Sequence, residues 1–135
     1  MRIRVKRMSK AARRLATIAE RVVAELMAGV DGASAATIAT ADGLDLAHAG
    51  SHAIDPSRLG AIVSSLAALS DAAGREAGLG RTRCLVVECG NGRLVVRCIE
   101  VRGESIVVAI LTNQHVLLGR VWTTMSGVES IMNAG

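Results

Sequence analysis

The 135-residue sequence has no phenylalanine and no tyrosine, and Trp122 is its only aromatic residue. Proteins that bind single-stranded nucleic acid usually stack the bases on aromatic side chains, which this chain almost entirely lacks. Half of the residues are hydrophobic, and many of these are Ala and Val, so the core must be aliphatic. The length predicts one domain, which buries roughly two-thirds of its unfolded surface without metals or disulfides.

Lysine is nearly absent, because Lys6 and Lys10 are the only two. The P-loop pattern G-x-x-x-x-G-K-[ST] does not occur, which excludes a P-loop GTPase or ATPase. The Gly-rich stretch GLGRTR (78–83) precedes a predicted strand, whereas a dinucleotide fingerprint follows one and opens a helix. No run reaches the ~18 apolar residues of a membrane span, and no apolar segment follows the basic N-terminus as in a signal peptide. We therefore expect a cytoplasmic protein.

Cysteine and histidine are also scarce, with three residues of each type: Cys84, Cys89, Cys98, His48, His52 and His115. An odd number of cysteines without a secretory signal fits a reducing compartment. No cysteine pair or acidic cluster completes a tetrahedral zinc site. All three cysteines fall in predicted strands, where we expect free, buried thiols that act as small apolar residues. The sequence thus predicts no catalytic residue, no metal and no cofactor.

Positive charge is concentrated at the start of the chain. Residues 1–14 hold seven basic and no acidic residues, whereas the remaining 121 hold nine basic and twelve acidic residues. We expect residues 1–8 to form a disordered basic arm and residues 9–135 to form the domain; translation starting at Met8 would remove most of this arm. Such an arm can contact anionic lipid or nucleic acid. A solvated tail is the simpler interpretation, and no nucleic-acid partner is expected.

Apolar residues three and four positions apart predict a helix from Ser9 to Val30, with Ser9 as its N-cap. The stripe consists of Leu15, Ile18, Val22, Leu26 and Val30. Strands are predicted at 33–41 and 44–49. Between them, Asp42 and Gly43 predict a two-residue type I′ turn, which needs a positive φ at both positions.

Asp55 and Pro56 predict the start of a second helix, which runs to about Ala77. Its large apolar residues, expected to face the sheet, are Leu59, Ile62, Val63, Leu66, Leu69 and Ala73. A second stripe is small, and consists of Gly60, Ser64, Ala68 and Ala72. Small residues four apart allow another backbone to approach closely, by analogy with membrane helices. The small stripe is therefore the expected partner surface, and an arginine at Ser64 or Ala68 is expected to block association.

The second half of the chain predicts three hairpin-linked strands and a helix. The strands are expected at 84–89, 93–102 and 105–112, with turns at Asn91-Gly92 and Gly103-Glu104. The Asn91-Gly92 turn places Cys89 opposite Leu94. One helix is expected from about Val116 to Met132, capped by Asn113. The order α–β–β–α–β–β–β–α predicts an α+β domain with an antiparallel sheet and helices on its faces.

Several of these segments resemble the Roadblock/dynein-light-chain family. The segment GVDGASAATIATADGLDLA (29–47) is similar to its helix exit and first hairpin, with the Asp-Gly-Leu turn at residues 42–44. The segment LVVECGNGRLVVRCIEVRGESIVVAILT (85–112) is similar to its three-strand meander, and LLGRVWTTM (117–125) to its closing helix. The resemblance spans about residues 12–132.

The resemblance implies a profilin-like or longin-like fold, with the first and last helices on one face of a five-stranded antiparallel sheet and the middle helix on the other. It also implies a homodimer formed through the middle helix (55–77) and the third strand (84–89). The interface residues expected on this basis are Gly60, Val63, Ser64, Ala67, Ala68, Asp71, Cys84, Val86 and Glu88.

Bacterial members of this family resemble regulators of Ras-like small GTPases. The expected function is therefore a non-enzymatic homodimer that regulates or scaffolds a partner GTPase. The alternative is a structural adaptor that assembles other proteins without affecting a GTPase. The family has no motif-defined catalytic residue to carry over, so none of the arginines is assigned as an arginine finger. The many Ala and Arg residues suggest a bacterial source with a high-GC genome.

Overall fold

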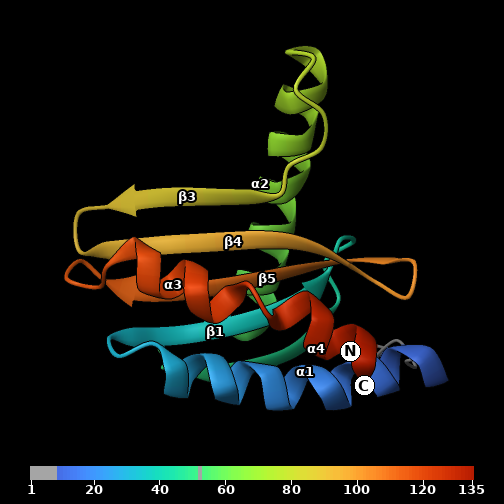
Figure 1. Ribbon diagram of the computed structural model, residues 1–135, viewed down its shortest axis with the longest axis horizontal. Coiled ribbons are helices and arrows are strands. Elements are labelled where there is room, and N and C mark those ends of the chain that lie inside the picture. Colours follow the sequence, from blue (N-terminus) through green and yellow to red (C-terminus); the bar gives the residue numbers. More distant parts are fainter. Residues whose placement is uncertain (1–8, 52) are drawn as a thin grey trace, which may run out of the picture.

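The computed structural model describes residues 9–51 and 53–135. Its elements in chain order are α1 (Lys10–Gly29), β1 (Ala33–Thr40), β2 (Asp45–Gly50), α2 (Pro56–Glu76), β3 (Cys84–Cys89), β4 (Gly92–Val101), β5 (Glu104–Asn113), α3 (Leu118–Met125) and α4 (Val128–Ala134). The strands form an antiparallel sheet in the order β2-β1-β5-β4-β3 (Figure 1). The five-stranded α+β fold predicted from the sequence is confirmed. The predicted basic arm at 1–8, including Met8, and His52 lie outside the described residues.

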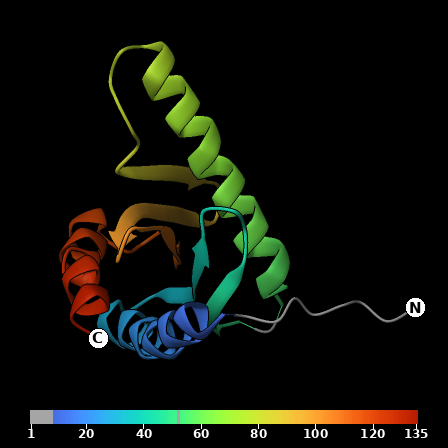
Figure 2. The same ribbon diagram turned by 90° about the vertical axis from the view of Figure 1, so that its right-hand side faces the viewer.

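Helices cover both faces of the sheet, but unequally. The helices α1, α3 and α4 lie on one face and α2 lies on the other (Figures 1 and 2). The larger core cluster belongs to the three-helix face and includes the whole predicted stripe of α1. The α2 face has a smaller cluster, whose buried members are Val63, Ala67, Val96, Val107 and Ala109. Most of the buried apolar surface, and therefore most of the hydrophobic stabilisation, lies on the three-helix face.

The first helix begins and ends where the sequence predicts. The Ser9 hydroxyl accepts a hydrogen bond from the Ala12 amide at 3.1 Å, which satisfies one of the free donors of the first turn. At the other end, the Val30 amide donates to the Leu26 carbonyl oxygen. Leu26 and Val30 are both 1 % exposed, so the end of α1 is fixed in the core before the chain enters β1.

The first hairpin turns at the predicted place but not in the predicted way. Asp42 does not have the positive φ of a type I′ turn, because among the described residues Arg102 is the non-glycine residue with that conformation. Gly43 has a φ of 96°, its amide donates to the Thr40 carbonyl, and the Thr40 amide donates to the Leu44 carbonyl. The loop thus contains three residues, with glycine at the left-handed position. The Thr40 hydroxyl donates to the Asp42 carboxylate and accepts from the Leu44 amide, so side chains stabilise this longer loop.

The second hairpin has a different register from the predicted one. Cys89 pairs with Gly92 rather than with Leu94, so the turn consists of Gly90 and Asn91. Gly92 is the first residue of β4 and lies against β5. A Cβ atom at this position would overlap with the Thr112 carbonyl oxygen, so the glycine is needed for close strand packing and not for the turn.

The third hairpin turn and the C-terminal helix also differ from the prediction. The turn consists of Arg102 (φ 51°) and Gly103 (φ 81°), one residue earlier than predicted. The single predicted C-terminal helix is two helices, α3 and α4, which are separated at Ser126-Gly127. Ser/Gly pairs are common sites of helix breaks. Asn113 does not cap α3, because its side chain accepts from the His115 amide, several residues before the helix begins.

The second helix packs on the sheet with a face that differs from the predicted one. Asp55 is its N-cap and Pro56 its first residue, as predicted. Its buried residues, however, are Gly60 and Ser64 of the small stripe, Val63 of the large stripe, and Ala67, which belongs to neither. The large residues Ile62 and Leu69 are 48 % and 69 % exposed.

Gly92→Ala is expected to lower the free energy of unfolding by about 1–3 kcal/mol, because the added methyl group forces β4 and β5 apart. The matched control is Gly90→Ala in the adjacent turn, where an added Cβ meets nothing within 4 Å and the φ is not left-handed. This control should stay within about 0.5 kcal/mol of the parent protein. Urea unfolding at one fixed protein concentration measures both variants. An equal decrease in the free energy of unfolding for both variants would show that the register of the β3–β4 hairpin given above is wrong.

Candidate protein interface and an adjoining cavity

Within the part of the chain that the structure describes, the strand β3 is at an edge of the sheet and pairs with β4 alone. Its two terminal residues, Cys84 and Cys89, are exposed, as is Glu88, and the three residues between Cys84 and Glu88 are half-buried. Unpaired backbone groups on an edge strand are a ready template for pairing with another chain. The cysteines are free thiols, as predicted, but Cys84 and Cys89 are not buried. The prediction of burial followed from their position in strands. It fails because β3 is at the edge of the sheet, where the ends of a strand are open to solvent.

The helix α2 extends past this edge. Its buried residues end at Ala67, and the part from Ala68 to Glu76 projects beyond β3 before the chain returns to the sheet (Figures 1 and 2). The exposed apolar residues Ile62 and Leu69 lie on one stripe of the helix, with Leu66 between them. Leu79, in the returning segment, is 82 % exposed. We call Ile62, Leu66, Leu69, Leu79 and the free edge of β3 the α2–β3 surface.

The predicted interface residues fall into three groups. Gly60, Val63, Ser64 and Ala67 are buried against the sheet of the same chain, so their side chains leave little surface for a partner. A Cβ atom added at Gly60 would make an ordinary contact with the Ala39 Cβ atom at 3.7 Å, and the Ser64 hydroxyl donates to the Thr40 carbonyl at 3.0 Å. The first half of the small stripe thus lies against the chain's own sheet, whereas Ala68 and Ala72 of the second half are exposed.

The second group is on the flank of α2, and the third is on β3. Ala68 is exposed, and Asp71 is half-buried, with its carboxylate accepting from the Thr82 amide at 2.6 Å. On β3, Cys84 and Glu88 are exposed, whereas Val86 is half-buried against the three-helix core. The Arg93 guanidinium forms an ion pair with the Glu88 carboxylate. The two predicted elements therefore remain candidates for the interface, and the exposed face of α2 is the part of the helix that a second chain can reach.

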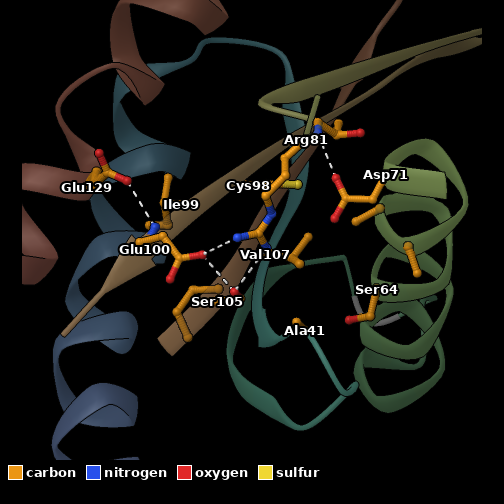
Figure 3. A pocket seen from close by; sticks show the side chains of 14 residues that line it. Ala41, Ser64, Asp71, Arg81, Cys98, Ile99, Glu100, Ser105, Val107 and Glu129 are labelled. Atoms are coloured by element: carbon orange, nitrogen blue, oxygen red, sulfur yellow. Dashed lines mark hydrogen bonds and ion pairs between the residues drawn. The ribbon is translucent and has the colours of Figure 1, made fainter. Parts of the chain in front are cut away.

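A cavity of about 230 Å³ lies on the other flank of α2, between this helix and the turn end of the β4–β5 hairpin (Figure 3). Buried apolar residues of both elements line its floor: Ala67, Ile106 and Val107. Glu100 and Asp71 lie on opposite sides, and the Arg81 side chain lies between them (Figure 3). The sequence did not indicate this cavity, because its walls come from segments that are distant along the chain.

Polar contacts hold the wall of this cavity that Glu100 provides. The Ser105 hydroxyl donates to Glu100 Oε1 at 2.7 Å, and the Glu100 amide donates to the Glu129 carboxylate at 2.9 Å. The Asn133 side-chain amide donates to the Glu100 carbonyl, also at 2.9 Å. The helix α4 thus fixes the last part of β4, which extends beyond the end of β3.

The third cysteine, Cys98, lines the same cavity and is half-buried. Burial raises the pKa of its thiol above the ordinary value, and the negative charge of Asp71 raises it further, with a smaller contribution from Cys84. The Arg81 charge acts in the opposite direction. A thiol with a raised pKa holds less of the nucleophilic thiolate at neutral pH. Cys98 is therefore poorly suited to act as a nucleophile.

No helix within the described residues is long and apolar enough to cross a membrane. A comparison with curated protein sequences gives no significant match. Structural similarity is extensive, however. MglB of Myxococcus xanthus matches with a TM-score of 0.74 and 13 % identity, over 96 % of this chain and 92 % of that one. A Roadblock/LC7 domain from Streptomyces avermitilis matches with a TM-score of 0.71 and 23 % identity, over 82 % and 91 % of the two chains.

A more distant structural match is profilin IB of Acanthamoeba castellanii, with a TM-score of 0.59 and 14 % identity over 86 % of this chain and 97 % of that one. These similarities confirm the profilin-like fold expected from the sequence. The model of the Roadblock/LC7 domain matches residues 18–112, from α1 through β5. Since this match covers well over half of the sequence, the chain belongs to the Roadblock/LC7 family.

Proposed function

We propose that this chain is a homodimeric regulator or scaffold that binds a Ras-like small GTPase and modulates its nucleotide cycle. Membership of the Roadblock/LC7 family supports a regulatory role rather than an enzymatic one. The observation that carries the proposal is the α2–β3 surface, which combines an exposed apolar helix stripe with an unpaired strand edge. The projecting end of α2, the exposed Leu79 and the start of β3 at Cys84 line one shared hollow. Two copies of such a surface can pair their edge strands and cover each other's projecting helices.

The chemistry of the α2–β3 surface favours a second copy as its occupant. The β3 edge offers the same backbone donors and acceptors in each copy, and a two-fold axis brings two identical edges together antiparallel. The exposed Leu69 and Leu79 then lose contact with water, which is favourable in proportion to the apolar area buried. The resulting dimer presents two copies of every remaining surface to the GTPase.

Leu69→Arg is expected to weaken the dimer, raising its dissociation constant by at least about tenfold, because a charged group replaces an apolar contact at the interface. Leu69 is 69 % exposed in the single chain, so the variant should still fold. Leu117→Arg is the matched control, since Leu117 is 70 % exposed at the start of α3, on the opposite layer. Sedimentation velocity over a concentration series measures both. If the two variants associate like the parent protein, the dimer surface is elsewhere.

The regulatory role is tested with a Ras-like GTPase encoded beside this protein. We expect the protein to bind this GTPase, and to change its single-turnover hydrolysis rate or its nucleotide exchange rate. Binding is measured in both the GDP-bound state and a GTP-analogue state. Binding without any change in either rate would favour the adaptor function instead. An absence of binding in both states would exclude that GTPase as the partner, even if the dimer is confirmed.

A further inference from the structure

The cavity between α2 and the β4–β5 hairpin is open to solvent and is not part of the α2–β3 surface. Its floor is apolar, whereas its walls carry three carboxylates and one guanidinium, from Asp71, Glu100, Glu129 and Arg81. The excess of negative charge at an apolar cavity favours a ligand with a cationic head and an aliphatic stem.

The Arg81 guanidinium already lies against these carboxylates, but its contacts with them are weak. Its guanidinium lies 3.5 Å from Glu100 Oε1 and 3.4 Å from Ser105 Oγ, both at the long end of the hydrogen-bond range. The Arg81 side chain is 69 % exposed and that of Glu100 is 51 % exposed, so solvent screens this ion pair and it contributes little stability.

The acceptors, by contrast, are held firmly. Glu100 is fixed by Ser105 through its side chain, and by Glu129 and Asn133 through its backbone. Asp71, on the opposite side, is fixed through the Thr82 amide. Acceptors that have short hydrogen bonds of their own, beside a loosely held cation, are the arrangement expected of a site whose own side chain is replaced when a ligand binds.

We propose that this cavity binds an arginine side chain of a protein partner, and that Arg81 occupies its mouth in the free protein. A planar guanidinium can donate to the Glu100 carboxylate and the Ser105 hydroxyl together, and its further N–H groups can reach toward Asp71 (Figure 3). The aliphatic part of the arginine packs on Ala67 and Val107. The inference does not depend on the partner being a GTPase.

The test uses the full-length protein and two small probes that differ in charge alone. N-acetyl-L-arginine methylamide carries the guanidinium, and N-acetyl-L-citrulline methylamide is its neutral counterpart of nearly the same shape. In a heteronuclear NMR titration at millimolar probe concentrations, the arginine compound should shift the backbone amides of Cys98, Glu100 and Ser105 in a saturable way. The citrulline compound should not.

Variants then identify which side chains bind the arginine compound and which compete with it. Arg81→Ala should tighten binding of the arginine compound by about threefold to tenfold, because the internal cation no longer competes. Glu100→Gln should weaken it by about tenfold, because a charge-assisted hydrogen bond becomes a neutral one. If Glu100→Gln does not give a folded spectrum, Asp71→Asn takes its place, since an amide oxygen can still accept from Thr82. The matched control is Arg83→Ala, which removes an exposed arginine of the same segment that does not line the cavity.

Three results would overturn the proposal. The first is equal binding of the arginine and citrulline compounds, or saturable binding of neither to the Arg81→Ala protein. The second is an equal gain in affinity for Arg81→Ala and Arg83→Ala, which would show a general effect of net charge. The third is unchanged affinity when the carboxylate of Glu100 is neutralised in a folded protein. None of these results bears on the homodimer or on the GTPase.

Discussion

The close contact between α2 and the sheet is the constraint on which the other features depend. Gly60, Ser64 and Ala67 have small side chains, and Val63 is the one large residue of α2 that is fully buried there. Leu59 packs at the margin of this small core, whereas Ile62 and Leu69 lie outside it. The exposure of Ile62 and Leu69 is thus a consequence of how the helix packs on its own chain.

The two faces of the sheet consequently have different roles. The three-helix face contains most of the buried apolar residues and stabilises the domain. The α2 face has a small core, and α2 continues past the sheet with one flank on the apolar α2–β3 surface and the other on the cavity. Exposed residues on this face can therefore vary with little effect on the larger core.

The edge of the sheet shows a similar division. Where β4 extends beyond β3, its backbone groups are satisfied by Glu129 and Asn133 of α4. The outer edge of β3 has no such cover within the described residues. The helix α4 thus covers the end of β4, while the edge of β3 next to it stays open. Covering part of an edge limits the places where another strand can pair with the sheet. The same α4 contacts fix Glu100, so the closed edge and the cavity share a wall.

The sequence by itself determined the order of the elements, the α1 stripe, the start of α2 and the sites of the first two hairpins, because caps, apolar periodicity and turn residues act over a few neighbouring positions. It did not determine the hairpin registers, since Gly92 looks like a turn residue until the neighbouring carbonyl of Thr112 is known. Nor did it determine which face of α2 is buried, because Gly60 and Ser64 permit close approach of any backbone, and only the tertiary structure selects the chain's own sheet. The cavity likewise depends on residues such as Asp71 and Glu100, which line its opposite sides only when the helix, the hairpin and the returning segment are packed together.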